Sequence, residues 1–244
     1  MEKGINKAVR QHLEMDEFFT GGLTIKSEGA MSQSIGGEDK EAIAQAGAEL
    51  EKIAEEVGKC CKCELGSSRK NAVPGEGSPR ARIVFVGEAP GADEDSQGRP
   101  FVGRAGKLLD NIIKAMGLER GDVFICNILK CRPPGNRDPR PEEIVSCLPY
   151  LQKQLEIIDP EIIVALGAHA AKTLLKTNEA IGRLRGHFHD YYTGVGKPPI
   201  KLMPTYHPAY LLRSYSPDNR RRVWEDMQKV LAELDLPIPG PAKK

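Results

Sequence analysis

The chain has 244 residues, of which 40% are hydrophobic and 28% are charged, enough to bury a full core in one globular domain. No apolar run approaches the roughly 20 residues of a membrane-spanning helix, and the N-terminus lacks the basic and apolar blocks of a secretory signal. Composition therefore argues against membrane and secreted proteins, and we expect a cytoplasmic protein.

The formal net charge is only +1, but the charges are unevenly distributed. Residues 1–59 carry 7 Lys and Arg against 12 Asp and Glu, a net of −5, whereas residues 60–244 carry 28 against 22, a net of +6. This distribution predicts a modestly basic body with an acidic N-terminal extension.

Residues 1–38 contain two Gly-Gly pairs and no sustained apolar periodicity, so we predict a flexible acidic extension. The remainder, residues 39–244, is predicted to form a single domain. A helix is expected over residues 38–59, where Ala, Glu, Leu and Ile recur at near-helical spacing.

Four short apolar runs then alternate with helical patterns. The runs at residues 83–86, 123–128, 162–166 and 202–205 predict strands, and residues 103–116, 141–158, 168–175 and 216–234 predict helices. This alternation predicts a three-layer α/β/α sandwich with a central, mainly parallel four-stranded sheet. Ligands usually bind at the carboxyl ends of such strands, where the polar residues of this chain are concentrated.

Four of the six cysteines form two pairs, Cys60 with Cys63 and Cys131 with Cys147. In a reducing cytosol, metal ligation or free thiols are more common than disulfides. The first pair lies on a tight turn that directs two thiolates at one metal, and folding would have to bring the second pair alongside. Zinc and an iron–sulfur cluster both accept four thiolates, and the spacing does not distinguish them.

The segment at residues 87–95 is bounded by glycines but lacks the phosphate-binding patterns G-x-G-x-x-G and G-x4-G-K-[ST]. Its carboxylates, Glu88, Asp93, Glu94 and Asp95, would repel phosphate and could instead orient a water molecule. A solvated acidic turn is the alternative interpretation.

Three further side chains are candidates for ligand contact. Asn127 ends a predicted buried strand, where its amide needs either a ligand or the following turn as a partner. His207 precedes a proline that restricts its backbone, and a neutral imidazole there could donate to a developing oxyanion. Phe101 lies between two turns and either stacks on a planar ligand or packs in the core.

Two basic segments lie beside the predicted pocket. One contains Lys130, Arg132, Arg137 and Arg140, and the other contains Arg213 and residues 220–222. Each alone is an ordinary solvated face, but two together favour nucleic acid binding through phosphate contacts.

In order along the chain, these motifs resemble those of family 4 uracil-DNA glycosylases. They comprise Gly87-Glu-Ala-Pro-Gly91, Gly98-Arg-Pro-Phe-Val-Gly103, Asn127, Lys130-Cys-Arg-Pro-Pro134 and His207-Pro-Ala-Tyr210, together with the four cysteines. The resemblance extends from Cys60 to Leu234 and leaves the acidic extension outside.

The resemblance implies a monofunctional hydrolase of base excision repair that flips uracil out of DNA and cleaves its N-glycosidic bond. It also implies a [4Fe-4S] cluster, with zinc as the alternative. The cluster ligands would be Cys60, Cys63, Cys131 and Cys147, and the uracil contacts would come from Gly87, Glu88, Ala89, Phe101, Asn127 and His207.

Chemical roles follow from this resemblance. Asn127 would accept from uracil N3–H and donate to O4, a match that cytosine lacks, and His207 would donate to O2 of the leaving base. In the best-known uracil glycosylases an aspartate stands at the position of Ala89, so Glu94 is the first candidate here to orient the water. Glu88 and Asp95 are the second candidates.

The residues expected to bind DNA are Arg132, Arg137, Leu211, Leu212 and Arg213, with the leucines entering or bracing the space that the base leaves. A related DNA-crosslinking branch carries a basic insertion and a nucleophilic histidine. Residues 131–138 contain neither, so covalent trapping is not expected.

Two other protein classes remain open from the sequence. One is a non-enzymatic, zinc-stabilised nucleic-acid-binding module, and the other is a polymerase accessory protein, which the acidic extension suggests. For the enzyme, we expect a nucleoid-associated monomer that acts on single- or double-stranded DNA, with a replication or repair partner at the extension.

Overall fold

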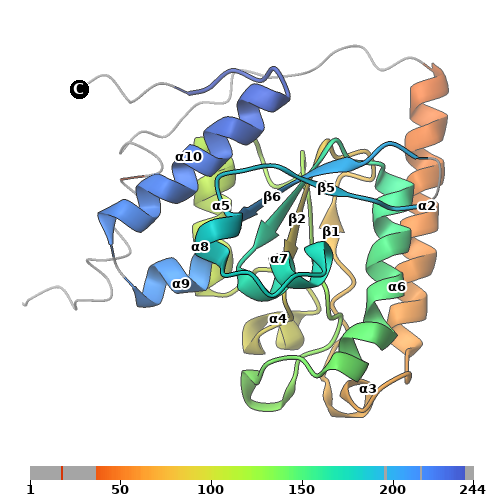
Figure 1. Ribbon diagram of the computed structural model, residues 1–244. Helices are drawn as coiled ribbons and strands as arrows, with labels where there is room; N and C mark the ends of the chain where they lie inside the picture. Colours follow the sequence, from red (N-terminus) through yellow and green to blue (C-terminus); the bar gives the residue numbers. More distant parts are fainter. Residues whose placement is uncertain (1–17, 19–36, 195–196, 215, 240–244) are drawn as a thin grey trace, which may run out of the picture.

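The computed structural model describes residues 18, 37–194, 197–214 and 216–239 (Figure 1). The predicted flexible extension at residues 1–38 therefore lies outside the described residues, apart from Phe18 and the start of helix α2 (Gly37–Lys59). Within the described ranges, no helix combines the length and apolarity needed to cross a membrane.

A six-stranded sheet with the order β1-β3-β2-β4-β6-β5 forms the centre of the fold. The four predicted strands are its parallel core: β3 (Phe124–Asn127), β2 (Ile83–Gly87), β4 (Ile162–Leu166) and β6 (Ile200–Thr205).

The predicted number of four strands is wrong, because an antiparallel strand flanks each side of this core. These edge strands are β1 (Glu76–Gly77), which pairs with β3, and β5 (His189–Tyr191), which pairs with β6. Strands of two and three residues are too short to display the alternation from which strands are predicted.

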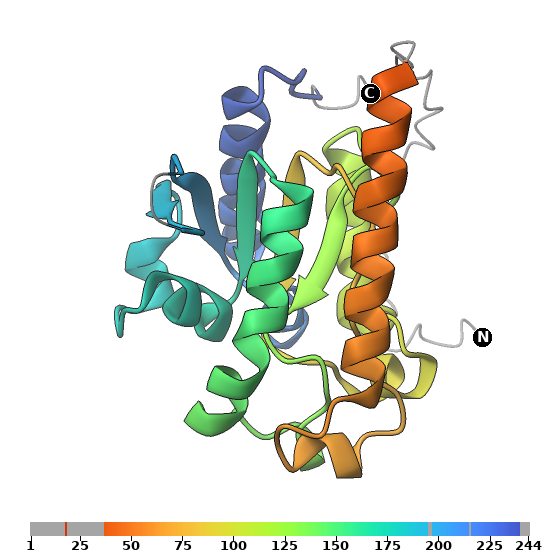
Figure 2. The same ribbon diagram turned by 90° about the vertical axis from the view of Figure 1, so that its right-hand side faces the viewer.

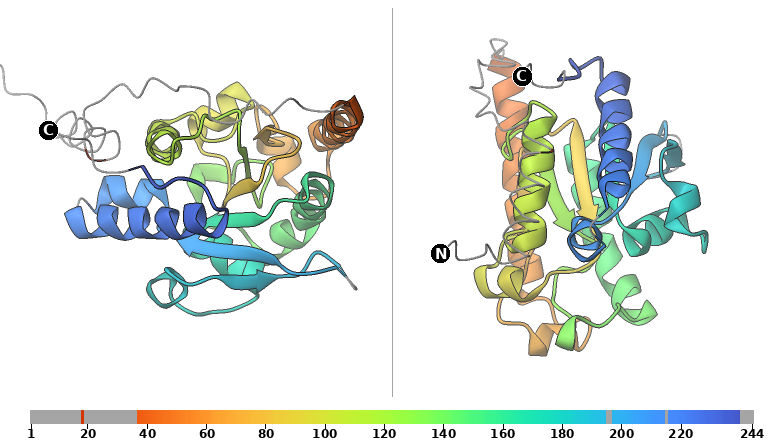
Figure 3. Two further views of the ribbon diagram at one scale, coloured as in Figure 1. Left: turned by 90° about the horizontal axis from the view of Figure 1, so that it is seen from above. Right: turned by 90° about the vertical axis from the view of Figure 1, so that its left-hand side faces the viewer.

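Helices cover both faces of the sheet, which confirms the α/β/α sandwich (Figures 2 and 3). One face packs against α2, α6 (Pro141–Ile158), α7 (Ala168–Leu175) and α8 (Ile181–Leu184). The other face packs against α5 (Arg104–Ala115), α9 (Pro208–Arg213) and α10 (Pro217–Glu233).

The central strands are buried on both sides, which explains their continuous apolar sequences. In β2, Ile83 and Phe85 belong to the core beneath α5 and α10, whereas Val84 and Val86 belong to the core beneath α2 and α6. Parallel strands between two helical layers read as apolar runs for this reason.

Short helices lie in the connecting segments. The helix α3 (Leu65–Ser68) follows α2, α4 (Ala92–Gln97) follows β2, and the 3-10 turn η1 (Pro134–Asn136) follows β3. The acidic segment therefore contains a helix rather than an open turn, and this helix decides which of its carboxylates face inward.

Candidate active site

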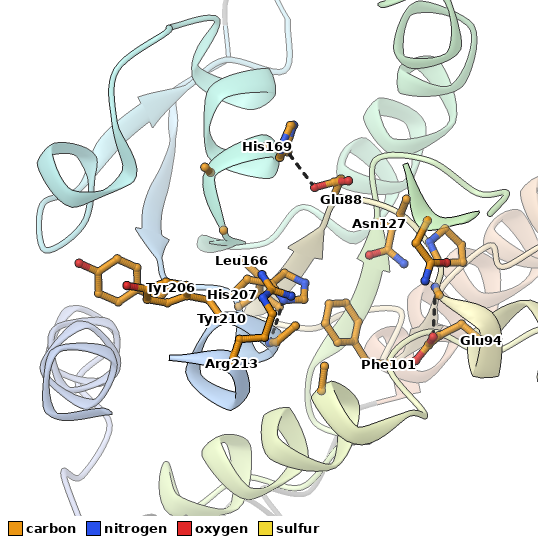
Figure 4. A pocket seen from close by; sticks show the side chains of 18 of the residues that line it. Glu88, Glu94, Phe101, Asn127, Leu166, His169, Tyr206, His207, Tyr210 and Arg213 are labelled. Atoms are coloured by element: carbon orange, nitrogen blue, oxygen red, sulfur yellow. Dashed lines mark hydrogen bonds and ion pairs between the residues drawn. The ribbon is translucent and has the colours of Figure 1, made fainter. Parts of the chain in front are cut away.

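A cavity of about 640 Å³ opens at the carboxyl ends of the central strands (Figure 4). Each of the four strands contributes to its wall through the residues at or just after its end: Glu88 and Ala89 after β2, Asn127 on β3, Leu166 on β4, and Tyr206 and His207 after β6. Parallel strands end at the same edge of a sheet, so residues distant in sequence meet there.

Asn127 presents an unsatisfied polar atom to this cavity. Its side chain is 2% exposed, and its Oδ1 has no hydrogen-bond partner among the described residues. An unpaired buried acceptor costs about 1 to 3 kcal/mol. The residue is thus suited to a ligand that brings an N–H group into the cavity.

Gly87 lies behind this site and allows two side chains to approach its backbone. A Cβ atom on Gly87 would lie 2.3 Å from Asn127 Oδ1 and 2.6 Å from the Phe101 ring. The structure therefore places Gly87 beneath Phe101 and Asn127, where any side chain would displace both.

Phe101 forms an aromatic wall of the cavity. It is 6% exposed, and its ring centroid lies 5.7 Å from that of His207, with 30° between the ring planes. Its backbone has a φ of +51°, in the left-handed region that a phenylalanine seldom adopts. Such strain is of order 1 to 3 kcal/mol and requires support from the surrounding structure.

Arg120 supplies part of that support. Its guanidinium donates to the carbonyl oxygens of Phe101, at 3.3 Å, and of Pro100. The same guanidinium pairs with Glu76 at 2.6 Å and with Asp110 at 2.7 Å, which fixes its own position. No sequence pattern predicts this role, because Arg120 lies in an ordinary polar turn.

His207 faces the cavity as a neutral hydrogen-bond donor. It caps the N-terminus of α9, where its Nδ1 accepts a hydrogen bond from the Ala209 backbone N–H at 3.0 Å. Burial, together with the charge of Arg213, lowers the pKa of His207 to about 4, and the charge of Glu94 opposes this change. A neutral ring that accepts at Nδ1 carries its proton on Nε2.

Glu94 and Asp95, both candidates to orient water, have structural partners. Glu94 Oε1 accepts from the backbone N–H groups of Val102 and Gly103, each at 2.9 Å, and Oε2 accepts from that of Gly91 at 3.1 Å. Glu94 therefore lines the cavity and also connects the turn at Gly91 to the loop at residues 102–103.

The prediction for Asp95 is wrong, because its side chain does not line the cavity. It is 4% exposed, and its Oδ1 accepts from the Lys70 backbone N–H at 2.9 Å. Glu88, in contrast, lies in the cavity wall with its Oε2 3.9 Å from His169 Nε2. Burial raises the pKa of Glu88, and the nearby His169 opposes that rise.

The two leucines predicted to enter DNA do not line the cavity. Leu211 is 1% exposed in the core shared with α5 and α10, and Leu212 packs partly against the same core. The prediction that Leu211 fills the space left by a base is therefore wrong, because an apolar residue on the inner side of α9 is needed for packing. Arg213 is exposed and lines the cavity.

The two arginines before α6 are tied to neighbouring side chains. Arg137 lines the cavity and forms a two-pronged pair with Glu143, with N–O distances of 2.9 and 2.6 Å. Arg132 lies outside the wall, and its Nε donates to Asn136 Oδ1 at 2.7 Å. Only Arg137 of these two therefore faces the cavity directly.

All four predicted cysteine ligands meet at a second, much smaller cavity. Cys60 and Cys63 follow α2, Cys131 follows β3, and Cys147 lies on α6. Cys61, at the surface, does not line this cavity, and neither does Cys126, which is buried in β3.

The surroundings of these thiols suit a metal group that binds thiolates. Burial raises the pKa of Cys147 to about 11 and also raises that of Cys131. Arg69 Nη1 nevertheless lies 2.9 Å from Cys131 Sγ, and the Lys130 backbone N–H donates to Cys147 Sγ at 3.2 Å. Donors aimed at buried sulfur favour its anionic form, which metals bind.

A single zinc ion and a four-iron cluster place different demands on four thiols. Over the described ranges, no group of three or more His, Cys, Asp or Glu side chains is arranged to hold one metal ion. One zinc would draw four sulfurs to about 2.3 Å from a common centre. A four-iron cluster holds its thiolates further apart, because each binds a different iron atom.

A buried lysine connects the two cavities. Lys130 is 1% exposed, and its Nζ donates to the Asn127 carbonyl oxygen at 2.9 Å and to Gln154 Oε1 at 2.6 Å. Its own backbone N–H contacts Cys147. The strand end that carries Asn127 is thus fixed to the chain segment around the cysteines.

Comparison with known proteins agrees with this arrangement. Residues 74–228 match the model of the uracil DNA glycosylase superfamily. The chain is 51% identical over 190 residues to the type-4 uracil-DNA glycosylase of Saccharolobus solfataricus, covering 76% of this chain and 86% of that protein. It is 53% identical over 186 residues to that of Sulfurisphaera tokodaii (74% and 83% coverage) and 49% identical over 182 residues to that of Thermotoga maritima (74% and 92%). The chain belongs to the uracil DNA glycosylase superfamily.

Proposed function

We propose that this protein is a monofunctional uracil-DNA glycosylase that removes flipped-out uracil from DNA by hydrolysing its N-glycosidic bond. The observation that supports this most directly is the buried, unpaired Oδ1 of Asn127 at a cavity that the Phe101 ring and the neutral His207 imidazole also line. The resulting abasic site is the starting point of base excision repair.

Base recognition rests on Phe101 and Asn127. The base leaves the helical stack, at a cost of a few kcal/mol, and stacks on the Phe101 ring. Asn127 Oδ1 accepts from uracil N3–H, and its amide group donates to O4. Cytosine has no N3–H and presents an amino group in place of O4, so two buried polar groups would be mismatched. The wall at Glu88 and Ala89 excludes the thymine methyl group.

Bond cleavage rests on His207. As the glycosidic bond breaks, negative charge develops on the uracil, and the Nε2–H of His207 donates to O2. The ring is already oriented for this task by the hydrogen bond that its Nδ1 accepts from the Ala209 backbone N–H. The neutral ring stabilises the charge by donating a hydrogen bond and keeps its proton. Preorganised donors of this kind act without reorganisation during the reaction.

The water that attacks the sugar is most simply oriented by Glu88. Both carboxylate oxygens of Glu94 already accept hydrogen bonds from backbone N–H groups. Within the described part of the chain, no hydrogen bond engages the Glu88 carboxylate, which has only the ion pair with His169. Glu88 therefore takes the role first expected of Glu94, and Glu94 shapes the loop that carries Phe101.

Arg213 and Arg137 are proposed to contact the DNA backbone at the rim of the cavity, where such contacts position DNA without reading its sequence. The partner is uracil-containing DNA, single- or double-stranded. A monomeric, nucleoid-associated enzyme with a repair or replication partner at its N-terminal extension stays a prediction.

A [4Fe-4S] cluster on Cys60, Cys63, Cys131 and Cys147 is the proposed cofactor. It would supply structural cross-links between the turn after α2, the loop after β3, and α6, and no step of the hydrolysis depends on it. The chain's own residues around these thiols keep Lys130, and through it the end of β3, in place.

Purified protein is expected to contain four iron atoms per chain and to absorb broadly in the visible range. Cys147→Ser should remove most of the iron and lower the melting temperature, because a buried ligand is lost from α6. Cys61→Ser is the matched control and should keep the iron content and the melting temperature of the wild type, since Cys61 is exposed and outside the cavity. Colourless wild-type protein with one zinc ion would refute the cluster and support the zinc-stabilised alternative.

The activity itself is tested with a labelled oligonucleotide that contains one uracil. Incubation with the protein followed by alkali should cut the strand at that position, because alkali cleaves abasic sites. The intact strand should persist without alkali, as expected of a monofunctional enzyme. An oligonucleotide with cytosine at the same position should remain uncut under both conditions. Survival of the uracil strand after prolonged incubation with iron-loaded protein would rule out the function.

A further inference from the structure

Two tyrosines at the mouth of the active-site cavity have no part in the reaction described above. Tyr206 follows β6 and Tyr210 lies on α9, and both line the cavity (Figure 4). Their ring centroids are 5.2 Å apart, with 43° between the ring planes. Tyr210 is 37% exposed, so a large aromatic surface faces solvent beside the entrance.

The inner ring of this pair is held by charged neighbours. The Arg185 guanidinium lies 5.6 Å from the centroid of the Tyr206 ring, and Arg222 Nη1 lies 3.5 Å from its hydroxyl oxygen. Arg185 is fixed in turn by two hydrogen bonds, at 3.0 and 2.6 Å, to the fully buried Asp226. The two arginines therefore hold the Tyr206 ring in place, and the Tyr210 ring packs against it.

Helix α9 presents three different chemical groups to the cavity. His207 at its N-cap, Tyr210 and Arg213 follow one another at intervals of three residues and all line the wall. Residues at that spacing share one side of a helix. Pro208 and Leu211 lie on the other side and are buried.

We propose that Tyr210, supported by Tyr206, stacks on the base next to the flipped uracil in the same strand, while Arg213 contacts the adjoining phosphate. This proposal rests on the proposed function, because it places the flanking base at Tyr210, three residues along α9 from the His207 imidazole that faces uracil. Stacking on an aromatic ring accepts any base, because every base has a π face. Tyr210 thus takes the bracing role that a buried Leu211 cannot.

The test measures binding of single-stranded oligonucleotides that carry 2′-fluorinated deoxyuridine, which resists cleavage, by fluorescence anisotropy. One oligonucleotide has ordinary bases on both sides of the uracil, and the other has abasic tetrahydrofuran spacers there. Tyr210→Ser is expected to weaken binding of the first roughly 5- to 100-fold and to leave binding of the second unchanged.

Tyr210→Phe should bind both oligonucleotides as the wild type does, because stacking requires the ring and not the hydroxyl. Tyr192→Ser is the matched control, since Tyr192 is 65% exposed and lies outside the cavity. Unweakened binding by Tyr210→Ser, or an equal loss on the spacer oligonucleotide, would overturn the stacking role. Absence of uracil release by the wild type in the alkali assay would instead overturn the proposed function.

Discussion

Replacing Asn127 with aspartate is expected to slow uracil excision by about 10⁴-fold at neutral pH. A carboxylate can accept from uracil N3–H but cannot donate to O4, so a negative charge would face an oxygen acceptor. Asn127 is 2% exposed, and water cannot offset that repulsion. The measurement is the single-turnover rate on a strand with one uracil.

The pH dependence of this variant provides an internal check. Burial raises the pKa of a carboxyl group, and the protonated form carries an O–H that can donate to O4. The rate of Asn127→Asp should therefore rise as the pH falls, whereas that of the wild type should not. Asn136→Asp, at an exposed asparagine on the rim, is the control and should retain most activity. Near-normal excision by Asn127→Asp would mean that uracil is recognised elsewhere.

Replacing His207 with alanine is expected to lower the single-turnover rate by about 10² to 10³-fold, the usual effect of removing one donor to a developing anion. Affinity for uracil-containing DNA should change little, because the donor acts mainly as charge develops in the transition state. His207→Gln should recover part of the rate, since its amide offers an N–H group. A loss of affinity that matches the loss of rate would contradict this role.

The pH profile of the wild type tests the protonation state of the same ring. Because burial holds the pKa of His207 near 4, the ring stays neutral from pH 8 down to about pH 5. The rate should show no inflection near pH 6.5, where an ordinary histidine titrates. An inflection there that disappears in His207→Ala would show that the ring titrates during catalysis.

The parallel core of the fold was predictable because burial on both faces leaves a simple pattern. The runs at 83–86 and 162–166 are continuous and apolar, and the pattern at 141–158 begins with a proline suited to a first helical turn. The edge strands β1 and β5 were not predicted, because two or three residues are too few to show an alternating pattern.

The sequence predicts which residue types form the site, but not which way each side chain points. Glu94 and Asp95 are adjacent in sequence, but α4 turns about 100° per residue, so one reaches the cavity wall and the other faces Lys70. The same rotation on α9 sends Leu211 inward and Tyr210 outward. Short helices of six residues lack the length from which such directions are inferred.

The contacts between Arg120 and the loop of Phe101 bear on the thermodynamics of binding. A flexible phenylalanine would lose rotational freedom when a base stacked on it, and that loss would weaken the complex. Here Arg120 holds the backbone that carries the ring through two carbonyl oxygens, and Phe101 is 6% exposed with its ring beside that of His207. The entropy of ordering the wall is lost during folding, so an incoming pyrimidine meets a rigid surface.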